Sequence, residues 1–164
     1  MAIWHFSISL MPAHSVKNTI GYISDVLDEY VDRPFEEIDL DKETPNYWAP
    51  SDARVHADSF RELVGPETKS YSDVIQFGAE EFRDYVEIRE GDLTFHFDLR
   101  YLRRELMDWI IDFACRHKLV IVAHGSGRLL EPKFEALKQE LLASRAAEFA
   151  RKPLESILKY GGGE

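Results

Sequence analysis

The sequence predicts an α+β fold, in which a mostly antiparallel sheet of about five strands carries helices on one face. Apolar and polar residues alternate over 4–10 and again over 93–99, as in strands of a sheet. Apolar residues recur at helical spacing over 98–117. Residues 90–92 (Glu-Gly-Asp) predict a tight hairpin, and no glycine-rich turn follows the first strand, so a doubly wound nucleotide-binding fold is disfavoured.

The first half of the chain predicts a strand, a helix and an irregular excursion. Residues 4–10 are expected to form a half-buried strand. Residues 16–31 predict one amphipathic helix, because their apolar residues recur at spacings of three and four. Prolines punctuate 33–52, so this segment is expected to be irregular. Ser51 or Asp52 is expected to cap a short helix that ends before Gly65-Pro66.

The second half predicts a hairpin sheet followed by alternating elements. The expected elements are strands at 71–77, 82–89 and 93–99, the helix at 98–117, an interior strand at 119–123, a short edge strand at 128–130, and helices from 132 and over 144–152. The predicted order is β-α-β-β-β-α-β-β-α-α. Residues 1–160 are expected to form a single domain with an acidic excursion at 33–52, and residues 161–164 a frayed tail.

Negative charge is concentrated in the first half. The net charge is −10, and residues 25–43 alone carry nine acids against two bases. Such a charge disfavours nucleic-acid binding, which requires a basic face, and repels an anionic membrane surface. No apolar run approaches the roughly 20 residues that span a bilayer. The balance favours a basic protein as partner.

The compartment is expected to be the cytoplasm. The N-terminus has neither the basic start nor the continuous apolar run of a signal peptide. Cys115 is the single cysteine and cannot form an internal disulfide, which fits a reducing environment. Its apolar helical surroundings predict a buried spacer rather than a nucleophile.

The acidic segment is the predicted partner-binding site, because aromatic residues accompany its acids and interfaces favour aromatic anchors in a polar rim. The predicted contact residues are Asp28, Glu29, Asp32, Phe35, Glu36, Glu37, Asp39, Asp41, Glu43, Tyr47 and Trp48. A solubilising face remains the alternative interpretation. A calcium loop is disfavoured because the required glycine and the downstream bidentate glutamate are missing.

Two other functions stay open. An enzyme or small-ligand protein would use His96, Asp98 and His124 around a pocket, with His96 and Asp98 on one face of a strand. A solvent-facing strand surface is the simpler interpretation of that pair. No metal spacing such as HxH, HExxH or CxxC occurs, so no cofactor is predicted. The third possibility is a structural homo-oligomer.

Three features of the second half occur together. They are a strand ending Phe97-Asp98-Leu99-Arg100, the helix directly behind it, and a tail that runs from Ser144-Arg145-Ala146-Ala147-Glu148-Phe149 to Lys152-Pro153-Leu154. With these features, about the last 95 residues of the chain resemble bacterial proteins of the polymorphic-toxin immunity type. This resemblance implies a non-enzymatic inhibitor of a toxin domain, with an acidic binding surface if that toxin is a nuclease.

Overall fold

The described chain is built around one antiparallel β-sheet. The computed structural model describes residues 4–23, 25–33, 45–49, 51–70, 73–78 and 83–153. The strands in these ranges are β1 (His5–Pro12), β2 (Val26–Val31), β3 (Glu67–Ser70), β4 (Ile75–Phe77), β5 (Tyr85–Ile88), β6 (Leu93–Asp98), β7 (Leu119–Ala123) and β8 (Ser126–Leu130). They form an eight-stranded sheet of order β2-β8-β7-β1-β6-β5-β4-β3, with antiparallel neighbours. The α+β class and the antiparallel sheet are therefore confirmed, whereas the expected five strands and the expected element order are wrong.

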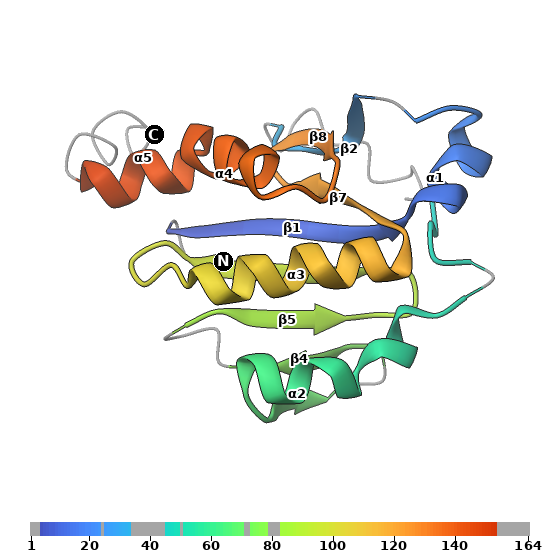
Figure 1. The fold of residues 1–164 in the computed structure, drawn as a ribbon, viewed down its shortest axis with the longest axis horizontal. Coiled ribbons are helices and arrows are strands. Elements are labelled where there is room, and N and C mark those ends of the chain that lie inside the picture. The colour runs from blue at the N-terminus through green and yellow to red at the C-terminus, as the bar shows by residue number, and fades with distance from the viewer. Residues whose placement is uncertain are drawn as a thin grey trace.

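Helices cover the sheet unequally. Those described are α1 (Ala13–Ile20), the 3₁₀ helix η2 (Ala53–His56), α2 (Asp58–Val64), α3 (Arg104–His117), α4 (Phe134–Ala143) and α5 (Arg145–Arg151). Helices α2, α3 and α4 lie over the same face of the sheet (Figure 1). Their apolar side chains belong to one core with residues of that face. Helix α1 instead buries Val16 against Met11 and Val122, which point to the opposite face. The expectation that all helices lie on one face therefore fails for α1.

Strand β1 lies at the centre of the sheet and is buried on both faces. All its residues from His5 to Pro12 are buried. Phe6, Ile8 and Leu10 contact the main core, while Ser7 and Ser9 point to the other face. That second face is covered by side chains from α1, β2 and the turn at 45–49. The expected half-buried strand is therefore wrong, because polar residues on one face of a strand do not guarantee contact with water.

The helix predicted over 16–31 is also wrong in its second half. Helix α1 ends at Ile20, since Gly21 adopts a left-handed conformation (φ 80°) that closes the helix. The chain then becomes β2 and pairs with β8, where the backbone N–H of Leu129 donates to Asp25 O and that of Gly125 donates to Tyr30 O. The apolar spacing is compatible with a helix, but tertiary pairing decides the conformation.

Most later elements lie where the sequence predicts them. The long helix is α3, and the interior strand at 119–123 is β7. The hairpin between β5 and β6 closes with Arg89 N donating to Asp92 O at 2.8 Å. Strand β8 pairs with both β7 and β2, so the expected edge strand at 128–130 is interior instead. Strand β3, the opposite edge of the sheet, was not predicted.

Two further expectations concern Cys115 and the C-terminal tail. Cys115 is exposed, with Sγ 3.6 Å from Pro132 O, so the expected buried spacer is wrong. It follows buried Ala114 at the boundary between the apolar stripe of α3 and its solvent face. The expected frayed tail at 161–164 lies outside the described residues, as do residues 34–44 and 50 of the acidic excursion.

Candidate functional site

Strand β2 forms one edge of the sheet and displays exposed carboxylates. The exposed acids on β2 or directly beside it, called the acidic edge below, are Asp25, Asp28, Glu29 and Asp32. Asp28 Oδ1 lies 3.8 Å from Arg33 Nη2, and Asp32 Oδ2 lies 3.9 Å from Arg145 Nη1. Exposed pairs at such distances stabilise a protein by about 0–1 kcal/mol. Another cation can therefore replace Arg33 or Arg145 beside the carboxylates of Asp28 and Asp32 at little energetic cost.

The structure brings together three of the eleven predicted contact residues. Asp28, Glu29 and Asp32 lie on the acidic edge. Six predicted contacts lie outside the described residues, namely Phe35, Glu36, Glu37, Asp39, Asp41 and Glu43. The last two, Tyr47 and Trp48, are only 1% and 2% exposed. The expectation that these two aromatic side chains anchor a partner is therefore wrong.

Tyr47 and Trp48 instead attach the end of the acidic segment to the sheet. Trp48 Nε1 donates to Leu10 O at 3.0 Å, and the Tyr47 hydroxyl donates to a carboxylate oxygen of Glu29. Burial and the contact with Glu29 raise the pKa of Tyr47 well above its usual range, so the hydroxyl stays protonated. These aromatic residues have a structural use that their position beside acids in the sequence did not reveal.

Exposed apolar side chains lie where the sequence predicts the middle of a helix. Tyr22, Ile23 and Val26 are 63%, 50% and 38% exposed. We call these three residues the apolar turn; Tyr22 and Ile23 follow the end of α1, and Val26 is the first residue of β2, next to the acidic edge. Gly21 was the available signal, because a helix that ends there leaves Tyr22 and Ile23 outside its buried stripe.

A buried polar network lies on the face of the sheet opposite the main core. Ser9 Oγ donates to Asp92 Oδ1 at 2.9 Å and lies 2.8 Å from both Thr94 Oγ1 and His124 Nε2. The Thr94 hydroxyl donates to Asp92 Oδ2 at 2.7 Å. Ser9 is fully buried. The network therefore joins β1, β6 and the end of β7, and the Ser9 hydroxyl is closed off from solvent.

His96 lies beside this network in a different set of contacts. Its Nδ1 is 2.7 Å from Ser7 Oγ, and its ring stacks on Tyr85 at a centroid distance of 4.1 Å. Its Nε2 has no hydrogen-bond partner in the described chain, with Glu87 Oε2 4.0 Å away. Burial, aided by the nearby His124, lowers the pKa of His96 to about 3. His96 is therefore neutral at pH 7.

The predicted set of His96, Asp98 and His124 is not assembled around one reacting position. The Asp98 carboxylate accepts from Arg100 Nη2 at 2.6 Å and from Arg100 Nε at 2.9 Å. The two histidines contact different serines of β1. Asp98 therefore orients the arginine, not a histidine. His96 and Asp98 are 4% and 1% exposed, so the simpler expectation of a solvent-facing surface is also wrong.

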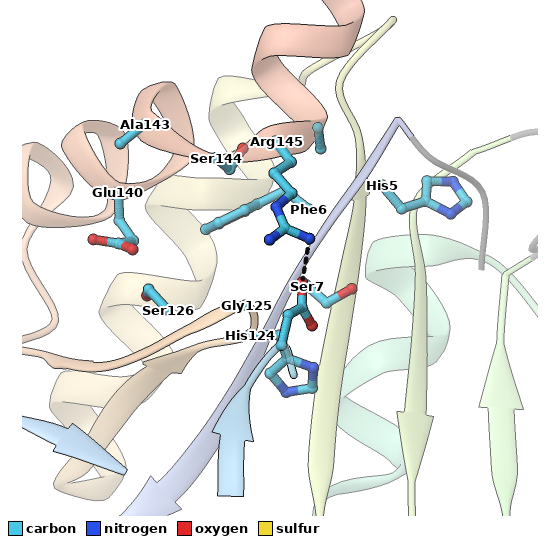
Figure 2. Close-up of a pocket in the computed structure, with 12 residues that line it drawn as sticks. His5, Phe6, Ser7, His124, Gly125, Ser126, Glu140, Ala143, Ser144 and Arg145 are labelled. Carbon is cyan, nitrogen blue, oxygen red and sulfur yellow. Dashed lines mark ion pairs between the residues drawn. The ribbon is translucent and has the colours of Figure 1, made fainter. Parts of the chain in front are cut away.

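A cavity of about 470 Å³ opens between β1, the β7–β8 turn and the junction of α4 and α5. Its charged lining comprises Asp32, Glu140 and Arg145, and His124 lies at its inner wall (Figure 2). Glu140 Oε2 lies 3.2 Å from Arg128 Nη1, and Arg145 extends from α5 to the ion pair with Asp32. The cavity can therefore bind a polar side chain or small molecule by charge and hydrogen bonds.

The residues of the described ranges contain no group of three or more His, Cys, Asp or Glu side chains placed to hold a metal ion. No helix in those ranges is both long and apolar enough to cross a bilayer. No family model, no curated protein and no solved structure matches the sequence.

Proposed function

We propose that this protein is a non-enzymatic binding protein whose acidic edge docks a basic protein partner. The observation that carries the proposal is the exposed apolar turn directly beside the exposed carboxylates of β2. Apolar anchors inside a charged or polar rim are the usual composition of a protein interface. Tyr22 takes the role of anchor that the sequence predicts for Tyr47 and Trp48.

Charge complementarity determines the kind of partner. In the sequence, residues 34–44 carry five further acids and one base. With a net charge of −10, the chain repels acidic proteins and attracts basic ones. Attraction of this kind raises the association rate and weakens as salt screens it. Affinity for the partner is therefore expected to depend on ionic strength.

Asp32 links the acidic edge to the cavity. Its carboxylate lines the cavity and forms a long, exposed ion pair with Arg145. A lysine or arginine of the partner can take the place of Arg145 on this carboxylate at little energetic cost. The cavity volume of about 470 Å³ leaves room for such a long side chain.

A second copy of the chain fits the acidic edge less well than a basic partner does. In a symmetric dimer each β2 would meet the β2 of the other copy. Asp28 and Glu29 would then face like charges, which destabilises strand pairing. Charged edge strands are a common protection against such association. The acidic edge therefore favours a partner of opposite charge over the structural homo-oligomer.

The partner class that we propose is a basic toxin domain, with the chain acting as its immunity protein in the cytoplasm. The resemblance of the second half to immunity-type proteins supports this assignment, as does the acidic surface. An inhibitor of this kind acts by covering its target, which requires no catalytic group. We accordingly propose no catalytic role for His96, Asp98 or His124.

The test begins with capture of the tagged full chain's partners from the native cell at about 0.1 M and about 1 M salt. The captured protein is identified, purified and titrated against the wild type, Tyr22→Ser and the double variant Asp25→Asn/Asp28→Asn. We expect Tyr22→Ser to weaken affinity about fivefold or more, as for a central interface residue. The double variant should slow association and reduce its salt dependence.

A matched control removes the same charge elsewhere. Glu62 and Glu105 are exposed on α2 and α3, so Glu62→Gln/Glu105→Gln changes the net charge equally without touching β2. This control should bind with nearly wild-type affinity. Recovery of no basic protein at either salt would overturn the proposal. So would a control that loses as much affinity as the β2 variants.

A further inference from the structure

We propose that a second cavity, at the end of the sheet where β5 begins and β6 ends, binds a phosphate group carried by a small molecule. The cavity has a volume of about 460 Å³ and is lined by Arg83, Asp84, Asp98, Arg100, Tyr101 and Arg103. Strands β8, β7 and β1 separate β6 from β2, so this site is distinct from the acidic edge.

Two buried carboxylates hold two of the arginines in place. Asp98 is 1% exposed and accepts from Arg100 Nε and Nη2, while Asp84 is 4% exposed and accepts from Arg103 Nε at 2.8 Å. Asp84 Oδ1 also accepts from the backbone N–H of Asp98 at 2.8 Å. The guanidinium of Arg100 lies over the Trp4 ring at 4.2 Å. The two arginine side chains are therefore fixed before any ligand arrives.

These contacts leave hydrogen-bond donors unused at the cavity. Asp98 occupies one edge of the Arg100 guanidinium, and Asp84 binds only Nε of Arg103. Nη1 of Arg100 and both terminal nitrogens of Arg103 consequently have N–H groups left for a ligand. Arg83 forms no ion pair with any residue in the described ranges. A planar fork of N–H donors matches the geometry of phosphate oxygens.

The charge of the cavity is positive within a strongly acidic chain. Although burial alone raises the pKa of Asp98, its hydrogen bonds to Arg100 hold that pKa below its usual range, so Asp98 is ionised at pH 7. Among the described lining residues, three arginines against two carboxylates give a charge of +1. The net charge of −10 repels long polyanions such as nucleic acid, but a small anion can reach such a pocket.

Tyr101 suggests which phosphate compounds fit best. Its ring is 72% exposed at the rim, 6.0 Å from the Arg100 guanidinium. An exposed ring beside a phosphate site can stack on the flat body of a ligand. A phosphate monoester with an aromatic body, such as a nucleoside monophosphate, would use both features, whereas inorganic phosphate would use the arginines alone.

The test is calorimetric titration of the full chain with adenosine monophosphate and with inorganic phosphate, against sodium chloride of equal ionic strength. We expect millimolar or tighter binding of phosphate. Arg83→Gln should weaken it about tenfold, since a charge-assisted hydrogen bond contributes that order of affinity. Arg103→Lys keeps the charge but loses the planar fork, so it should also weaken binding.

Arg104→Gln provides the matched control. Arg104 is 72% exposed, follows Arg103 directly and pairs only loosely with Asp108 at 3.4 Å, outside the cavity. It should leave phosphate binding unchanged. Tighter binding of the nucleotide than of phosphate would assign a monoester with an aromatic body, and equal binding would assign the phosphate group alone. Absence of binding beyond the chloride control, or equal losses in Arg104→Gln and Arg83→Gln, would overturn the proposal.

Discussion

Replacing Gly127 with alanine tests how tightly β2 is held against β8. Gly127 has φ 67°, and a Cβ there would lie 2.4 Å from Leu27 O and 2.7 Å from Val31 Cγ2, both on β2. A left-handed conformation costs a non-glycine residue about 1 kcal/mol. Overpacking against atoms that cannot move away costs about 1–3 kcal/mol more. We therefore expect the free energy of unfolding to fall by about 2–4 kcal/mol, with β2 displaced from β8.

Urea denaturation gives the loss of stability, and hydrogen exchange of the β2 amides shows whether the strand has moved. Gly21→Ala is the control, because Gly21 also has positive φ (80°) but no atom of the described residues, apart from its chain neighbours, lies within 4 Å of its added Cβ. It should lose only about 1 kcal/mol, from backbone strain. Equal losses in the two variants, or unchanged protection of β2 in Gly127→Ala, would refute the steric reasoning.

Trp48→Phe keeps most of the buried ring but leaves Leu10 O without its donor, so the free energy of unfolding should fall by about 1–3 kcal/mol in urea. A loss no larger than that of the exposed Tyr101→Phe would contradict the anchoring role of Trp48. The pKa of His96 is about 3 in the folded chain and about 6.5 in the unfolded chain. Between these pH values the unfolded chain binds more protons than the folded chain. The free energy of unfolding therefore falls as the pH falls from about 6.5 to about 3. Urea titrations at stepped pH give the change in the free energy of unfolding per pH unit, and His96→Gln should reduce it by up to about 1.4 kcal/mol per pH unit. An unchanged pH dependence would show that His96 is not a neutral buried group.

The local pattern of apolar residues was sufficient to predict the segments whose own residues determine their conformation. The apolar stripe of 104–117 faces the core as α3, and the β-branched run at 119–123 lies inside the sheet as β7. Alternation in 93–98 placed Phe95 and Phe97 in the core. These segments carry a period that matches only one kind of buried surface.

Strand β2 could not be predicted in the same way. Its apolar residues, with Leu27 buried and Val26 exposed, continue the helical spacing of α1 beyond Gly21. Only pairing with β8, about a hundred residues later in the chain, makes the strand the better conformation. The same long-range contact put the acids of the candidate site on a sheet edge rather than a helix face.

The exposed acids of the candidate site could be predicted from the sequence, but the positions of its aromatic residues could not. Composition alone indicated an acidic surface, and Asp28, Glu29 and Asp32 are exposed. Composition does not distinguish an aromatic side chain that faces a partner from one that packs inward. Tyr47 fills the space beneath β2, so its role depends on a strand that the sequence did not reveal.

The position of β1 has a consequence for how the protein is made. Ser9 contacts Thr94 and His124, which lie 85 and 115 residues further along the chain. A ribosome therefore releases the central strand long before either neighbouring strand has been synthesised. Pairing at such separation is slow and leaves apolar strand surface exposed in the meantime. We therefore expect the nascent first half to expose apolar strand surface until β7 has emerged and the centre of the sheet can close.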